Sequence, residues 1–99
     1  MAERNIEFES DPAKAERNVK RHGITFEEAE TAFDDPFALI VEDETHSFDE
    51  PRELLTGYSN RNRLLLIVFT QRSANFIRII SARVATRSEH KRYEQEKRF

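Results

Sequence analysis

The spacing of apolar residues changes twice along the chain and divides it into helical, extended and again helical parts. Asp11 is an N-cap acceptor before a proline, and Gly23 can end a helix in the left-handed conformation, so we expect a helix over 12–22. After a Thr-x-x-Glu capping box, apolar residues recur at helical spacing until Pro36. This pattern predicts a second helix over 26–34.

From Phe37 onward the apolar residues alternate with polar ones, which is the period of a β-strand. The segment 63–70 is apolar on both faces, as in a central strand. Near the N-terminus, Ile6 and Phe8 alternate with polar neighbours and predict a short edge strand over 4–9. The other predicted strands are one that begins at Phe37 and ends in the acidic loop 43–50, then 52–59, 63–70 and 76–84.

Close to the C-terminus, Thr86-x-x-Glu89 is a second capping box, which opens a helix to the end of the chain. The element order β-α-α-β-β-β-β-α predicts an α+β fold. We expect an antiparallel β-meander sheet of about four to five strands, with two N-terminal helices and one C-terminal helix packed against it. Because 99 residues can build one hydrophobic core, 1–99 is expected to be a single domain.

The amino-acid composition excludes several classes of site and of protein. The chain has no cysteine, so a disulfide framework, a thiolate nucleophile and a cysteine zinc site are excluded. The longest apolar run, Leu64 to Phe69, is far shorter than the ~20 residues needed to cross a bilayer. The N-terminus also lacks the basic and apolar regions of a signal sequence. We therefore expect a cytoplasmic protein without a membrane segment.

The net charge of −3 hides a division between the two parts of the chain. Residues 1–60 hold six Lys or Arg against sixteen Asp or Glu, whereas 61–99 hold ten against three. Eight of those ten cations are arginines, whose planar guanidinium binds phosphate through two hydrogen bonds. Phosphate is thus the expected ligand class. The alternative is that the two parts neutralise each other within the fold.

The strand 76–84 mixes apolar and cationic positions. An arginine in such a strand needs either a carboxylate partner or a substrate, and both remain open for Arg78 and Arg83. Arg83, at the end of the strand, is the better functional candidate. The period of two places Ile77, Ile79, Ser81 and Arg83 on one face, and Phe76, Arg78, Ile80 and Ala82 on the other.

Further polar side chains follow closely in sequence: Ser81, Arg87, His90, Lys91, Arg92 and Tyr93. The N-terminus of the last helix adds unpaired backbone N–H groups and the positive end of its dipole, which favour an anion. We expect the arginines at the end of the last strand and the start of the last helix to converge on one pocket for an anion.

Two histidines are candidates for chemistry. His22 follows Lys20 and Arg21 at the end of the first helix, where a histidine can carry a proton near neutral pH or serve as a helix cap. His46 lies in the acidic loop 43–50 without the ligand spacing of a metal site. A solvated loop without a metal ion is expected there.

The sequence contains no G-x-S-x-G, P-loop or H-E-x-x-H motif, and no cofactor is expected. Metal-independent RNA cleavage remains, in which the 2′-hydroxyl of the substrate attacks the neighbouring phosphate. Such a site needs only cations for the developing charge and one or two proton carriers. Arginines with a histidine or a tyrosine supply both.

One ordered series of residues runs through nearly the whole chain, roughly 6–94. It consists of Asp11-Pro12-x-Lys14-x-x-x-Asn18-x-x-Arg21-His22-Gly23, Phe26-x-x-Ala29, Phe33-x-Asp35-Pro36, Glu50-x-Arg52 with Gly57, and Ile77-Arg78-Ile79-Ile80-Ser81-Ala82-Arg83. This series resembles the BrnT toxin family. Arg21 stands where that family usually has Lys before His-Gly, so the charge is kept but a lysine-specific role is not expected.

The resemblance implies a RelE-like fold and a ribonuclease toxin of a type II toxin-antitoxin system, which suppresses translation. It also implies a BrnA-like antitoxin with a ribbon-helix-helix DNA-binding domain. In that family the complex represses its own operon, so operator DNA is bound only through the antitoxin. A homodimer or a 2:2 complex with the antitoxin is expected.

The leading hypothesis gives the candidate residues two roles. In the catalytic set, arginines stabilise phosphate and His22 or Tyr93 carries protons; the members are His22, Arg52, Arg72, Arg83, Arg87 and Tyr93. The expected RNA-binding residues are Lys20, Arg21, Arg78, Ser81, Lys91 and Arg92. The acidic surface that includes Glu42, Asp43 and Glu44, or a groove beside it, is expected to receive a basic antitoxin segment.

Two alternatives come from other classes of function. The chain could be a catalytically inactive binding module that acts with its antitoxin as a transcriptional corepressor. It could also be a general interaction domain whose charged residues are purely structural. Salt dependence separates them from a phosphate binder, because phosphate binding weakens steeply as salt rises.

Overall fold

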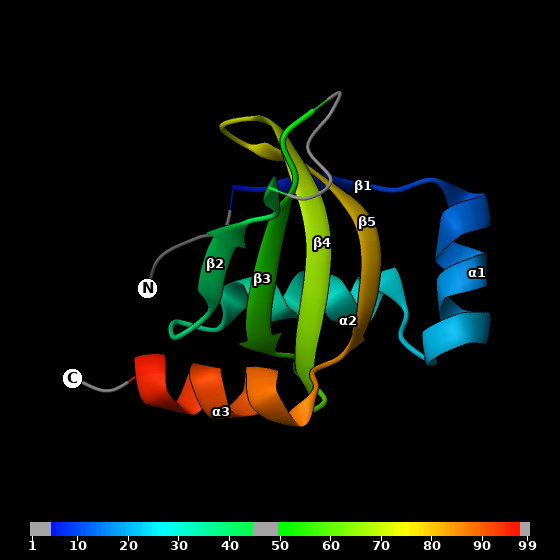
Figure 1. Cartoon of the computed structure of the whole chain (residues 1–99). Helices are drawn as coiled ribbons and strands as arrows, with labels where there is room; N and C mark the ends of the chain where they lie inside the picture. Colours follow the sequence, from blue (N-terminus) through cyan, green and yellow to red (C-terminus); the bar gives the residue numbers. More distant parts are fainter. Residues whose placement is uncertain (1–4, 45–49, 98–99) are drawn as a thin grey trace.

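The computed structural model describes residues 5–44 and 50–97. Its strands form one five-stranded sheet in the order β1-β5-β4-β3-β2 (Figure 1). The strands are β1 (Glu7–Glu9), β2 (Leu39–Glu42), β3 (Glu53–Tyr58), β4 (Leu64–Ser73) and β5 (Phe76–Val84). The helices are α1 (Pro12–His22), α2 (Phe26–Thr31), which continues into the 3₁₀ turn η1 (Ala32–Asp34), and α3 (Arg87–Glu96).

The α+β class and the element order agree with the prediction, but the pairing of the first strand differs from it. Strands β2 to β5 form the expected antiparallel meander. β1, however, pairs with β5 in parallel, with Phe8 opposite Ile77, so the sheet is mixed. Alternation of apolar residues specifies which side chains face the core but not the direction of a strand. The sequence pattern therefore could not distinguish the two pairings.

Helix α2 covers one face of the sheet, and α3 lies on the opposite face along the end at which β3 finishes (Figure 1). The main core lies under α2, where Ile24, Phe26 and Ala29 meet the apolar residues of β3, β4 and β5. Phe33 joins this core to β1 and β4, because its ring makes T-shaped contacts with Phe8 and Phe69 at 5.1 and 5.0 Å. Aromatic packing thus links the edge strand to the centre.

Two arginines of the basic part of the chain pair with carboxylates of the acidic part. The Arg63 guanidinium donates to both carboxylate oxygens of the buried Glu28, which also accepts a bond from the Ser59 hydroxyl at 2.7 Å. Arg72 lies 3.5 Å from Glu9 and 3.6 Å from Glu50. The proposed internal neutralisation therefore occurs at these positions.

Helix α1 is held at the margin of the sheet by one buried side chain. β1 pairs only with the first three residues of β5, so no strand covers the margin further along. There the Asn18 amide donates to the carbonyl of Ala82 at 2.8 Å and accepts from the Ala82 N–H at 3.1 Å. It also donates to the Ile24 carbonyl at 2.9 Å. Asn18 thus pairs with β5 much as a neighbouring strand would.

A β-bulge in β5 changes which residues share a face. Val68 lies opposite Ser81 and Phe69 opposite Ile79, so Ile80 is an extra residue without a partner. Arg78, Ser81 and Arg83 lie opposite Thr70, Val68 and Leu66, which are alternate residues of β4 and share the face that α3 packs on. The expected grouping of Ile77 and Ile79 with Ser81 and Arg83 is wrong, because the extra residue inverts the alternation after it.

The Asn18 contacts generate a stability prediction. Asn18→Ala leaves the N–H and carbonyl of Ala82 and the carbonyl of Ile24 without their partner, in a buried environment where each lost bond is costly. We expect a loss of about 2–3 kcal/mol in the free energy of unfolding, measured by urea denaturation. The exposed Glu16→Ala change on the same helix is the control, with an effect within about 0.5 kcal/mol. Equal stability of the two variants would contradict this account.

Candidate functional site

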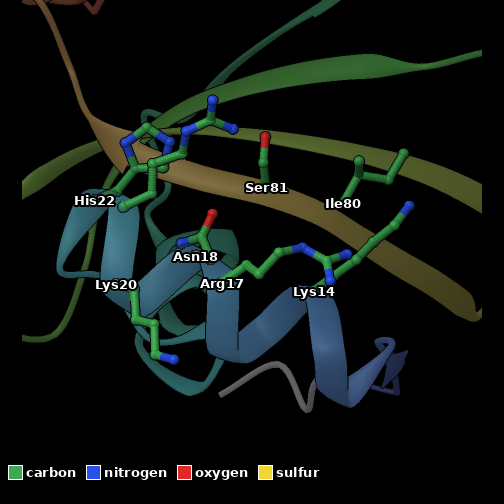
Figure 2. A pocket seen from close by; sticks show the side chains of 8 residues that line it. Lys14, Arg17, Asn18, Lys20, His22, Ile80 and Ser81 are labelled. Carbon is green, nitrogen blue, oxygen red and sulfur yellow. The ribbon is translucent and has the colours of Figure 1, made fainter.

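A groove of about 610 Å³ lies between α1 and β5 (Figure 2). Four of its lining side chains are lysines or arginines, one is a histidine, and none is a carboxylate. A concave surface lined by cations attracts an anion. The lining residues are Lys14, Arg17, Asn18, Lys20, Arg21, His22, Ile80 and Ser81.

Local sequence explains why one helix supplies most of these groups. Asp11 accepts a bond from the Ala13 N–H and starts α1, and Gly23 ends it with a φ of 73°. Lys20, Arg21 and His22 occupy the last turn, where the negative end of the helix dipole favours cations. All the cationic side chains of the groove are exposed and therefore accessible to a ligand.

The bulge in β5 brings two neighbouring side chains to the other wall of the groove. Ile80, the extra residue, and Ser81, which follows it, both line the groove. Figure 2 shows Asn18 projecting from α1 toward β5, while the Lys20 side chain extends away from Ser81 and lies at the rim. The wall formed by β5 is thus part apolar and part hydroxyl.

Sequence reasoning found four of the eight lining residues, namely Lys20, Arg21, His22 and Ser81, and missed Lys14 and Arg17 as site residues. Their signal was present in the spacing of Lys14, Arg17, Asn18 and Arg21, which lie three, four and seven residues apart and therefore near one another on a helix. The overall acidity of residues 1–60 concealed this basic helix.

Arg83 lies close to the groove along the strand. It occupies the same face of β5 as Ser81, two residues away, which corresponds to about 6.6 Å of strand. Its guanidinium donates to both oxygens of Glu89 at 2.9 Å, while its side chain stays 36% exposed. This hydrogen-bonded pair lowers the pKa of Glu89 and raises that of Arg83. Arg83 is thus paired but accessible.

Tyr93 does not lie in the groove. It is 2% exposed, packs against the Tyr58 ring at 5.5 Å between centroids, and donates its hydroxyl to Asp35 Oδ2 at 2.6 Å. Burial and the bond to Asp35 both raise the pKa of Tyr93. The prediction that Tyr93 carries protons is not supported, because its hydroxyl proton is held in a part-buried bond to Asp35, which also accepts a bond from the backbone of Tyr58 at the end of β3.

The remaining candidates lie elsewhere. Arg52 precedes the first residue of β3 and Arg72 is near the end of β4. These strand ends lie at the end of the sheet away from α3 (Figure 1). Arg72 is six residues along β4 from Leu66, the partner of Arg83, which is about 20 Å. Arg78 is half-buried on β5, and the exposed cations Arg87, Lys91 and Arg92 share α3 with three carboxylates. Arg52 and Arg72 therefore do not share a pocket with Arg83, because the length of the strands separates the two ends of the sheet. The expectation that the arginines at the end of β5 and the start of α3 converge on one pocket stays a prediction.

Among residues 5–44 and 50–97, no three His, Asp or Glu side chains gather as a metal site would require. His46 and most of the acidic loop lie outside the described residues. No helix in the described part of the chain is long and apolar enough to span a membrane.

Comparison with solved structures identifies a protein with a similar fold. The 1.1 Å crystal structure of the Brucella abortus ribonuclease toxin BrnT matches with a TM-score of 0.65. The match covers 83% of this chain and 99% of that one, at 19% sequence identity. This likeness shows the fold. Among curated proteins there is no match.

The family comparison shows more than the fold. A family model described as the ribonuclease toxin BrnT of type II toxin-antitoxin systems matches residues 11–89. This range includes the basic helix α1, the whole of β2 to β5 and the Arg83–Glu89 pair. The resemblance drawn from the sequence is confirmed. The chain belongs to the BrnT family of ribonuclease toxins of type II toxin-antitoxin systems.

Proposed function

We propose that this toxin cleaves RNA without a metal ion and that the groove between α1 and β5 binds the RNA backbone beside the bond that breaks. The observation that carries the proposal is the composition of the groove, whose lining residues include four Lys or Arg and one His but no carboxylate. A polyanion is the natural ligand of such a surface. Because its cationic side chains are exposed, a single strand of RNA can reach them.

The chemistry follows from what these side chains can do. A base removes the proton of the 2′-hydroxyl, the 2′-oxygen forms a bond to phosphorus, and the bond from phosphorus to the 5′-oxygen breaks. A proton passes to that leaving oxygen, so the products are a 2′,3′-cyclic phosphate and a 5′-hydroxyl. Lys14, Arg17 and Arg21 stabilise the charge that develops on phosphorus oxygens, and His22 carries a proton. Arg83 adds a guanidinium from the neighbouring part of β5.

The role of His22 predicts a specific loss. Wild-type protein cleaves a single-stranded RNA in the presence of EDTA, and His22→Ala lowers the cleavage rate about 100-fold, since one general acid-base group contributes at least that factor. Labelled RNA resolved by gel electrophoresis gives the rate and shows the cyclic phosphate end. The control is His90→Ala on α3, an exposed histidine outside the groove. Cleavage that requires added metal would refute the mechanism, and equal rates for both variants would remove His22 from it.

The groove also predicts how binding responds to salt. RNA with a 2′-deoxy nucleotide at the cleaved position binds without reacting. Lys14→Ala and Arg17→Ala each weaken its binding and reduce the slope of log Kd against log salt by about one, as expected for one lost phosphate contact. Arg61→Ala, an exposed cation in the turn before β4, serves as the charge control and leaves the slope near that of wild type. An identical slope in all variants would place the RNA elsewhere.

RNA cleavage in the cytoplasm explains the proposed effect on the cell, which is inhibition of translation, and it requires an antitoxin that keeps the enzyme inactive. We assign the antitoxin contact to the acidic end of β2, at Glu42, Asp43 and Glu44, because it lies in the part of the chain with sixteen carboxylates and six cations. The complex, a dimer or a 2:2 assembly, binds operator DNA through the ribbon-helix-helix antitoxin.

Charge reversal tests this contact. Replacing Glu42, Asp43 and Glu44 by Lys weakens binding of a BrnA-like antitoxin at least tenfold, because like charges at an interface repel. Titration calorimetry at two salt concentrations measures the effect. Reversal of Glu16 and Glu27, exposed carboxylates on the first two helices, is the matched control. Unchanged affinity in the first variant would show that the antitoxin binds another surface.

A further inference from the structure

The hydrogen bonds of Arg83 account for three of its five N–H groups. Nη1 donates to Glu89 Oε1 at 2.9 Å and to the Val84 carbonyl at 3.2 Å, and Nη2 donates to Glu89 Oε2 at 2.9 Å. The fork formed by the two terminal nitrogens is thus fully used. What remains is the Nε hydrogen and the second Nη2 hydrogen, which lie on the same edge of the planar group.

That edge has no partner among residues 5–44 and 50–97. Two parallel N–H donors in a fixed plane match two oxygens of a phosphate. The Arg83 side chain is 36% exposed, so a ligand can reach it. Arg63 illustrates the same edge in use, because its Nε and Nη2 both donate to the carboxylate of Glu28. The free Nε and Nη2 edge of Arg83 can therefore bind two oxygens of a ligand in the way that Arg63 binds the two oxygens of Glu28.

Glu89 is itself held by the backbone. Its Oε1 accepts the Thr86 N–H at 2.8 Å, and the Thr86 hydroxyl accepts the Glu89 N–H at 3.2 Å, which together form the capping box of α3. The carboxylate therefore has a fixed place relative to the end of β5. A mobile arginine would lose side-chain entropy on binding a phosphate, whereas one restrained by a carboxylate has already lost much of it.

We propose that Glu89 is a positioning residue, which orients Arg83 so that its Nε and Nη2 edge receives an RNA phosphate next to the groove. The proposal rests on the proposed function, since it names a residue that acts through Arg83 at the same site. Arg83 lies two residues from Ser81 on one face of β5, so a chain that follows the groove reaches the guanidinium at the next phosphate.

Replacement of Glu89 by Gln separates orientation from charge. The amide oxygen still caps the Thr86 N–H, but the amide nitrogen faces the Arg83 guanidinium and breaks the paired bonds. If Glu89 acted only through its charge, its loss would improve RNA binding. If Glu89 orients Arg83, the variant cleaves RNA more slowly than wild type, with kcat/KM reduced about tenfold and most of the change in kcat. Glu96→Gln, an exposed change on the same helix, removes the same charge without touching Arg83.

A double-mutant cycle tests whether Glu89 acts through Arg83. Arg83→Lys keeps the charge but loses the fork, so Glu89→Gln added to it has little further effect. A purely structural role for Glu89 predicts instead that both changes lower the midpoint of thermal unfolding and that their effects on kcat/KM multiply. Multiplied effects, or a Glu89→Gln variant as active as Glu96→Gln, would overturn the proposal.

A second measurement decides the case even without cleavage. The Nε–H signal of Arg83 in nitrogen-15 NMR spectra is followed while inorganic phosphate is added. A shift in wild type that is absent in Glu89→Gln supports the proposal, and equal behaviour of both proteins refutes it. If wild type fails to cleave RNA, the proposed function is wrong, whereas this titration still reports whether Glu89 prepares Arg83 for a phosphate.

Discussion

The site depends on the pairing of the Asn18 amide with the backbone of Ala82. Helix α1 lies beside the sheet and not over one of its faces, so apolar contact between the helix and the sheet contributes little to its position. Three hydrogen bonds from one buried side chain replace that missing contact. Because Asn18 faces β5, the cations on the neighbouring positions of the helix come to line a groove with Ile80 and Ser81. The same contact occupies backbone groups of β5 beyond the three residues that pair with β1.

Most of the fold could be predicted from the sequence, because its signals are local. The Asp11 and Thr25 caps set the starts of α1 and α2, and both residues make the expected bonds. Alternation and the continuous apolar segment 63–70 identified strands of the meander. The parallel direction of β1 and the bulge at Ile80 could not be predicted, since direction and one extra residue depend on pairing between distant segments. That single residue moved Ser81 and Arg83 to the opposite face from Ile77 and Ile79.

The candidate site was harder to predict than the fold, because charge was averaged over long segments. The part of the chain with ten cations suggested a basic final helix, yet α3 carries as many carboxylates as lysines and arginines. The basic helix is α1, inside the acidic part. Arginine count was also misleading, since Arg63 and Arg72 are held by carboxylates. Only side-chain geometry distinguishes such structural arginines from one with an open donor edge.

The carboxylates Glu28 and Asp35 attach both helical layers to the same end of the β3–β4 hairpin. Arg63 and Ser59 lower the pKa of Glu28 below its ordinary 4.5. Burial alone would raise the pKa of Asp35, but bonds from the Tyr58 N–H, the Tyr93 hydroxyl and the Phe37 N–H bring it below its ordinary 3.8. Each ionised group therefore stabilises the fold at any pH above its ordinary value, and this stabilisation is lost as the pH falls through the lowered one. Strong acid would loosen α2 and α3 together, so the helices on opposite faces share one acid sensitivity.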